Sequence, residues 1–230
     1  MNDRNPAPDT EELSTDRSAA PPLIWLLLAL AAVAIVGVVL LLWNANAAPA
    51  EVSPEVTFAR DMSAHHNQAV EMALILRDRT EDPNLRLFAL DIMLTQQAQI
   101  GQMQGWLSVW QRPLQGTTAP MAGHGAMMGM ATQAAVNELH GLPVAEAETR
   151  FLELMIRHHE GGLQMAQDVL AATQRPEVIR LARSIIDGQT AEVTYMRALL
   201  EQRGKEAPAM QMEVPLDGQT EGHVEGHTQP

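Results

Sequence analysis

The 230-residue chain has no cysteine, few aromatic residues and an excess of acidic over basic ones. The lack of Cys excludes disulfide frameworks, cysteine zinc sites and thiol nucleophiles. With aromatic residues at only 3%, strand-rich sandwiches and barrels are disfavoured and helices are expected. A net charge of −13 is the opposite of what a nucleic-acid-binding protein needs. No Gly-x-Ser-x-Gly or His-Glu-x-x-His motif indicates a hydrolase.

One long segment near the N-terminus carries no charge. Residues 23–43 are twenty-one consecutive uncharged residues, enough at about 1.5 Å per residue to cross a hydrocarbon core of about 30 Å. Trp25 and Trp43 stand near its two ends, where interfacial aromatics are common. We therefore predict a single-pass anchor in the cell membrane over residues 23–43, preceded by an acidic tail over residues 1–22.

The distribution of basic residues predicts the orientation of this anchor. Arg4 and Arg17 precede it, and no Lys or Arg follows until Arg60, which favours a cytoplasmic N-terminus and an exported remainder, in the periplasm or at the cell exterior. A cleaved secretory signal is the alternative, because residues 45–47 read Ala-Asn-Ala, the form of a cleavage site.

The exported part contains an internal duplication. Shifting the chain by 93 residues superposes at least twelve identical residues within about fifty positions, without a gap. Among them are Phe58 on Phe151, Met62 on Met155 and Met72 on Met165. Pro54, Pro83 and Pro176 each follow a typical helix start or loop, and the apolar positions recur at helical spacing. Each copy therefore reads as a helical hairpin.

Two such hairpins predict an all-α domain, a four-helix bundle over residues 54–203. Its repeats are expected at residues 54–111 and 143–203. A linker over residues 112–142 joins them, with a short helix near residues 131–140. The polar tail over residues 204–230 is expected to be disordered.

A Met-x-x-His-His pattern followed by a further Met recurs in both repeats. At 100° per residue these side chains fall within about 120° of one helix face, the apolar face that points to the interior. Neutral imidazole and thioether both bind metals, and thioether suits soft Cu(I), with Ag(I) following by the same logic. The candidate ligands are Met62, His65, His66, Met72, Met155, His158, His159 and Met165.

Other interpretations of this pattern stay open. A carboxylate-bridged di-iron site is disfavoured because no Glu-x-x-His motif is present and Glu71 falls on the opposite helix face. Zinc bound by His and carboxylate is possible but leaves the Met spacing unexplained. The histidines could also form a polar layer that fixes how the hairpins pair.

The linker and the C-terminal tail offer further soft ligands. Within ten linker residues separated by Gly and Ala stand Met121, His124, Met127, Met128 and Met130, which we predict to load metal. Packing explains such a glycine-rich run poorly, although its Met side chains could instead cap the bundle end. Weaker candidates in the tail are Met210, Met212, His223 and His227.

Several of these segments resemble a known family, domain of unknown function 305, whose members have a ferritin-like four-helix fold. The resembling stretches are FARDMSAHHNQAVEMA, FLELMIRHHEGGLQMA, QQAQIGQMQGWL and the linker run MAGHGAMMGM. Some members are similar to periplasmic copper- and silver-binding proteins linked to metal tolerance. The resemblance implies the same Met and His ligands as the motif.

Together these features predict a membrane-anchored, extracytoplasmic protein that binds Cu(I) or Ag(I) for sequestration, tolerance or hand-off to a copper-export or copper-assembly partner. Copper or silver would be held by side chains, with no covalently bound cofactor and no catalysis. Two alternatives remain: a metal-dependent oxidoreductase using the His-His pairs, and a metal-free helical interaction scaffold.

Overall fold

The structure is a computed structural model that describes residues 22–45 and 47–209. The chain divides into two compact units, Met1–Ala47 and Ala48–Pro230. The first contains one helix, α1 (Pro22–Ala45). Over the described residues, no helix is found to be both long enough and apolar enough to span a membrane. The anchor expected over residues 23–43 therefore stays a prediction. The acidic tail and the four tail ligand candidates lie outside the described residues.

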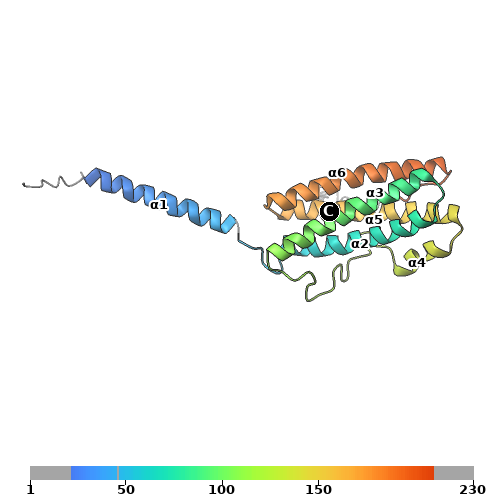
Figure 1. Cartoon of the computed structure of the whole chain (residues 1–230), viewed down its shortest axis with the longest axis horizontal. Helices are drawn as coiled ribbons and strands as arrows, with labels where there is room; N and C mark the ends of the chain where they lie inside the picture. Colours follow the sequence, from blue (N-terminus) through green and yellow to red (C-terminus); the bar gives the residue numbers. More distant parts are fainter. Residues whose placement is uncertain (1–21, 46, 210–230) are drawn as a thin grey trace, which may run out of the picture. The chain divides into compact units, whose positions relative to one another are not determined.

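The second unit is all-helical, with two long hairpins and one short helix between them (Figure 1). The first hairpin is α2 (Pro54–Arg79) and α3 (Pro83–Val109), and the second is α5 (Val144–Ala172) and α6 (Pro176–Gln202). Helix α4 (Gln133–Gly141) lies in the connection between them. The expected short helix is thus confirmed, starting and ending slightly later than predicted.

Local signals explain where these helices start. The Ser53 hydroxyl accepts a hydrogen bond from the Val56 amide, and the Asp82 carboxylate accepts from the Asn84 and Leu85 amides, so both first-hairpin helices have N-caps followed by proline. Helix α5 starts without a side-chain cap, directly after Pro143. At the end of α6, Gly204 takes a φ of +65°, which suits a helix terminus.

The hairpins pack against each other through α2 and α5. Two hydrogen bonds show that these helices run antiparallel. Thr80, after α2, donates to Glu148 near the start of α5 at 2.6 Å, and Thr173, after α5, donates to Glu55 at the start of α2 at 2.8 Å. Each residue of the first bond corresponds to one of the second at the offset of 93. The two halves therefore dock reciprocally, each closing the helix end of the other.

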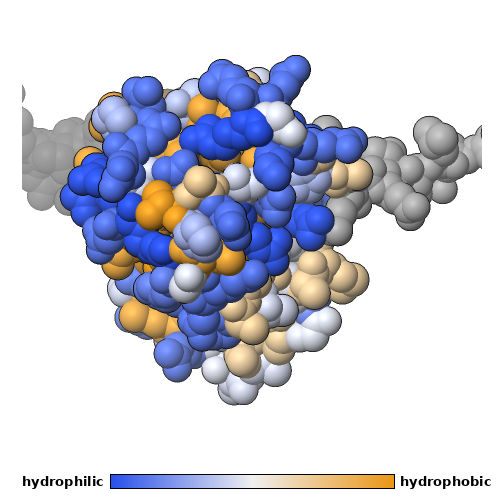
Figure 2. Space-filling model, turned by 90° about the vertical axis from the view of Figure 1, so that its right-hand side faces the viewer, coloured by the Kyte–Doolittle hydropathy of each residue, from blue (hydrophilic) through white to orange (hydrophobic). Residues whose placement is uncertain are grey.

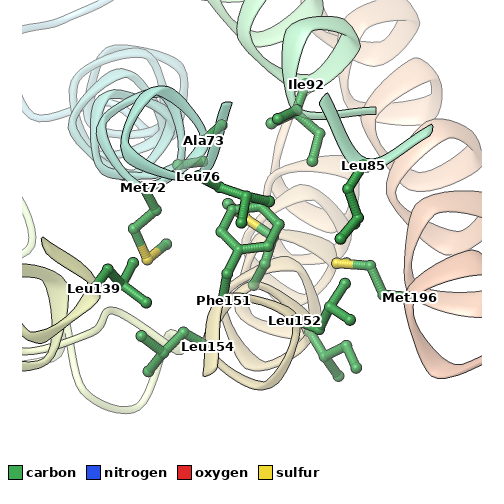
Figure 3. Close-up of a cluster of buried hydrophobic side chains, with 14 of the residues drawn as sticks. Met72, Ala73, Leu76, Leu85, Ile92, Leu139, Phe151, Leu152, Leu154 and Met196 are labelled. Carbon is green, nitrogen blue, oxygen red and sulfur yellow. The ribbon is translucent and has the colours of Figure 1, made fainter. Parts of the chain in front are cut away.

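The core consists of two hydrophobic clusters, each built from both hairpins. One joins the second half of α2 and first half of α3 to the first half of α5 and the end of α6, and includes α4 (Figure 3). The other joins the first half of α2 and the end of α3 to the end of α5 and the start of α6. The surface of one end of this unit is largely hydrophilic (Figure 2). The interior between the two clusters is where the polar residues lie.

Candidate metal centre

A layer of buried polar side chains separates the two hydrophobic clusters. His65, His66, His158 and His159 are all fully buried, and Gln96 and Gln189 are nearly so. On every long helix the polar residue stands between positions assigned to different clusters. His65 and His66 follow Met62 of one cluster and precede Ala69 of the other. We call these six residues the histidine layer.

Three of the four histidines donate Nε2–H to a neighbour. His65 Nε2 lies 2.9 Å from the backbone carbonyl of Met128, which can only accept. His66 Nε2 lies 2.7 Å from the amide oxygen of Gln99, and His159 Nε2 lies 2.7 Å from the Glu192 carboxylate. In a neutral imidazole whose Nε2 carries the proton, Nδ1 carries a lone pair. Each of these three rings therefore offers one unprotonated nitrogen to the interior.

None of these Nδ1 atoms has a hydrogen-bond partner, and neither ring nitrogen of His158 has one. The amide groups of Gln96 and Gln189 are also buried without partners. Leaving one buried polar group unpaired costs about 1–3 kcal/mol, so a layer with this many unpaired atoms is expensive as it stands. Lone pairs that face inward, with Nε2–H fixed by an outer acceptor, are the arrangement of metal-binding histidines.

The two hairpins meet at a pair of imidazole rings in close contact. The imidazole centroids of His65 and His158 lie 3.7 Å apart, with 31° between the ring planes. The rings of His65 and His66 are 6.3 Å apart, and those of His158 and His159 are 6.2 Å apart. The sequence left open whether the two pairs share one place; the structure brings them into one layer.

Burial keeps three of these rings neutral, those of His65, His66 and His158. It lowers the pKa of His65 to about 4, although the Met128 carbonyl acts in the opposite direction. Burial, with the neighbouring His65, lowers the pKa of His66 to about 3 and holds the pKa of His158 well below the ordinary value of 6.5. At neutral pH these three imidazoles are therefore uncharged, and each keeps one nitrogen lone pair that a metal ion can bind without displacing a proton.

The predicted methionines lie on both sides of the layer. Met62 and Met165 belong to one hydrophobic cluster, and Met72 and Met155 belong to the other. Met62 and Met155 each precede the His pair of their helix by three and four residues, which places them one turn away. Two residues not proposed from the sequence, Met103 and Met196, join these groups from α3 and α6. Along the interior, the eight candidates therefore form three successive groups: thioethers in one cluster, imidazoles in the histidine layer, and thioethers in the other cluster.

The linker covers this layer on the side where α2 and α5 meet. The Gln68 side chain exchanges two hydrogen bonds with the Ala131 backbone, at 2.8 and 2.9 Å. Gly129 has φ +72° and lies so close to Arg157 that a side chain there would meet its backbone. At Gly161 of α5, an added Cβ would lie 1.8 Å from the Met128 carbonyl oxygen. These two glycines let the linker approach α5 closely enough to reach His65.

The linker candidates have different surroundings. Met121 is buried in the second cluster, Met128 and Met130 pack against it, and Met127 is largely exposed. Packing therefore accounts for three of the four methionines, in line with the alternative that these side chains cap the bundle end. The imidazole of His124 is partly exposed and lies beside Asp61. Among the described residues, no group of three or more His, Cys, Asp or Glu side chains is placed to hold a metal ion.

A family model described as Domain of unknown function (DUF305) matches residues 55–200, which include the histidine layer and most of both hairpins. The chain belongs to the DUF305 family. A DUF305 crystal structure from Streptomyces coelicolor, described as a candidate secreted protein, is 42% identical, with a TM-score of 0.65 over 70% of this chain and 99% of that one. A DUF305 fragment from Deinococcus radiodurans is also 42% identical, with a TM-score of 0.61 over 67% of this chain and 99% of that one.

Among the other similar structures is CopM with copper bound. Its Cu(I)-bound form is 26% identical, with a TM-score of 0.55 over 66% of this chain and 97% of that one. Its Cu(II)-bound form is 28% identical, with a TM-score of 0.57 over 67% of this chain and 99% of that one. No curated protein matches the chain. The resemblance to DUF305 is thus confirmed, and the similar structures include a protein with copper bound in both oxidation states.

Sequence reasoning missed the residues that surround the histidines. Gln99 and Glu192 hold the outer nitrogens of His66 and His159, and they are themselves 93 residues apart, so the duplication could have pointed to them. Gly161 was detectable as a helix-interior glycine, a residue that costs about 1 kcal/mol relative to Ala and so needs a reason. The Met128 carbonyl had no sequence signal, because its role depends on the path of the linker.

Proposed function

We propose that this chain is a copper-binding protein whose histidine layer and flanking methionines hold Cu(I) for sequestration or hand-off. The observation that carries the proposal is the set of five buried imidazole nitrogens that have no hydrogen-bond partner. Three of them are lone-pair nitrogens by the proton position of their own ring. Metal ions that each bind one or two of these nitrogens would satisfy them and turn a costly layer into a favourable one.

The donor set favours a soft monovalent ion. Thioether and neutral imidazole ligands suit Cu(I), and Ag(I) is expected to compete by its softness. A single positive charge also costs less to bury than a divalent one, and the Glu192 carboxylate beside His159 compensates part of it. The Cu(I)- and Cu(II)-bound forms of CopM support copper as the ion.

The proposal includes no catalysis. All four histidines are fully buried, so in this conformation a substrate has no access to the layer. This burial favours a binding protein over the oxidoreductase alternative, which would need an open coordination position. A copper-export or copper-assembly protein would be the recipient of the ion.

The proposal also extends to the finer predictions about architecture and location. A ferritin-like four-helix bundle derived from one duplicated hairpin is supported by the reciprocal Thr–Glu contacts and the shared offset of 93. An extracytoplasmic location and an anchor over residues 23–43 are supported by the uncharged run and by the secreted character assigned to the Streptomyces relative. Deleting residues 23–43 should move the chain from the membrane fraction to the soluble fraction; unchanged membrane association would contradict the anchor.

Competition for copper tests the proposed site. The full-length chain in detergent micelles is titrated anaerobically with Cu(I) against a chromophoric chelator, beside a His65→Ala/His158→Ala variant and an exposed-histidine control, His140→Ala. We expect the wild type and the control to take the same amount of copper and the double variant to lose copper from the layer. Bound copper should also raise the melting temperature of the wild type.

A gentler variant guards against loss of the fold. Met62→Leu/Met155→Leu conserves volume and should cost little stability while removing two thioethers. It should bind Cu(I) more weakly than the wild type while its helical circular dichroism is unchanged. Equal copper binding by all variants would move the ion out of the layer and overturn the proposal, and no binding by the wild type would favour the scaffold alternative.

A further inference from the structure

An opening remains beside the histidine layer where the linker crosses the bundle. A surface cleft of about 360 Å³ lies between the start of α2, the end of α5 and the linker. Its walls include the apolar residues Phe58 and Val169. Five other lining residues carry carboxylate, imidazole or thioether groups: Asp61, His124, Met128, Met165 and Asp168. We call this the linker cleft.

Two side chains of the linker cleft, His124 and Asp61, face each other with acceptor atoms. His124 Nδ1 lies 3.1 Å from the Ala122 carbonyl, so Nδ1–H donates there and Nε2 carries the lone pair of the neutral ring. That nitrogen faces the Asp61 carboxylate, with 3.5 Å between Nε2 and Oδ2. The other Asp61 oxygen accepts from the Met121 amide at 3.0 Å, which holds the carboxylate in place. Two facing acceptors attract a cation, which can be a proton on the ring or a metal ion.

The two methionines of the linker cleft lie between the cleft and the histidine layer. Met165 lines the cleft and is also part of the buried cluster that contains Met62, one turn from His65. Met128 also lines the cleft, and its carbonyl accepts the hydrogen bond from His65. One residue therefore contacts both the opening and the layer.

The corresponding methionine in the other half does not line an opening in the same way. At the offset of 93, the counterpart of Met165 is Met72, which is fully buried. Figure 3 shows its sulfur pointing toward Leu139 of α4, and both residues belong to the same buried cluster. Helix α4 thus covers Met72, whereas Met165 lines the linker cleft.

We propose that the linker cleft is a loading site, where Cu(I) binds first at His124 and Asp61 and then passes along Met128 and Met165 to the histidine layer. The destination of the ion rests on the proposed function, whereas binding at the linker cleft does not. The acidic chain, with a net charge of −13, favours the approach of a cation.

Nuclear magnetic resonance of the full-length chain in micelles, with labelled methionine methyl groups and imidazoles, tests the first contact. With less than one equivalent of Cu(I), we expect the signals of His124, Met128 and Met165 to shift while that of the exposed His140 stays unchanged. These shifts should persist in the His65→Ala/His158→Ala variant. Equal shifts at His124 and His140, or none at His124, would overturn the loading site.

The rate of copper uptake tests the route. In stopped-flow transfer from a chromophoric chelator, we expect His124→Ala and Met128→Leu to slow uptake at least fivefold, while His140→Ala matches the wild type. Met128→Leu keeps the backbone carbonyl that His65 uses, so the variant tests the thioether alone. Wild-type rates in both variants would overturn the route. If the His65→Ala/His158→Ala variant binds less copper but takes it up at the wild-type rate, that result bears on the proposed function and leaves the route supported.

Discussion

The two hairpins repeat one pattern but surround their histidines with different charges. In the first half, His66 and its helix neighbourhood are accompanied by neutral amides: Gln99 holds the ring, and Asn67 and Gln104 occupy the positions nearby. In the second half, the equivalent positions are Glu192, Glu160 and Arg197. Glu192 holds His159 at 2.7 Å, and Arg197 donates to the buried Glu160 at 2.6 Å.

The comparison separates what the fold needs from what one half has added. Both halves keep a histidine pair, a buried Gln and methionines on either side, so these serve the shared architecture. Only the second half carries carboxylates beside its pair. A carboxylate on the outer nitrogen makes an imidazole a stronger ligand than an amide does, so the second half should dominate copper affinity.

The first prediction concerns the buried histidines that both halves share. Lowering the pH should change the stability of the metal-free chain more than any substitution below. His65 has a pKa of about 4 in the folded chain against 6.5 ordinarily, because burial disfavours its charged form. Between these values only the unfolded chain binds the proton, so the metal-free protein is most stable above pH 6.5 and loses stability as the pH falls toward 4. At about 1.4 kcal/mol per pKa unit, His65 alone contributes about 3 kcal/mol.

Urea unfolding between pH 7.5 and 4 measures this loss. His66 and His158 shift in the same direction and should add to it. His65→Gln should flatten the pH dependence, whereas His140→Ala should leave it unchanged. A metal-free chain of equal stability at both ends of this range would contradict the buried neutral layer.

The second prediction concerns the position where the halves treat the linker oppositely. Gln68 binds the linker, while its counterpart Gly161 makes room for it. Gly161→Ala places a methyl group against the Met128 carbonyl and should destabilise by about 2–3 kcal/mol despite the better helix propensity of Ala. Gly188→Ala, in open space on α6, is the matched control and should stabilise by up to about 1 kcal/mol. Chemical denaturation compares them; equal stability of both variants would refute close contact with the linker.

The third prediction removes the ion pair found only in the second half. Arg197→Gln leaves the Glu160 carboxylate buried without its partner and should cost about 2 kcal/mol. Adding Glu160→Asn recreates the neutral pair of the first half and should restore most of the loss. Thermal melts of both variants measure these effects. A double variant with a melting temperature no higher than that of Arg197→Gln would mean that Glu160 and Arg197 are not coupled.

The smallest effect is expected from exchanging the outer partners of the histidines. Glu192→Gln makes the second half like the first and should weaken Cu(I) binding about tenfold, with little change in stability. Gln99→Glu should strengthen it. Chelator competition gives both affinities, and an unchanged affinity in both variants would show that the charge difference between the halves has no bearing on copper.

Much of the architecture could be predicted because its signals are local. Proline after Ser53 and Asp82 marks helix starts, and the offset of 93 reveals two hairpins. What the sequence could not provide was the path of the linker, since the contact of Met128 with His65 joins residues 63 positions apart without a motif. The same limit applied to the methionines: their spacing indicated one set, whereas antiparallel docking divides them between two clusters.

The histidine layer also has a consequence for how the chain chooses its folded arrangement. Apolar faces made of Met, Leu and Ala are interchangeable, so two similar hairpins could slide along each other by a helical turn at little cost. With the layer in the middle of α2 and α5, such a slide would place imidazoles against aliphatic side chains and remove the contact between the His65 and His158 rings. The polar residues thus select a single alignment of the two halves, at the cost of some stability.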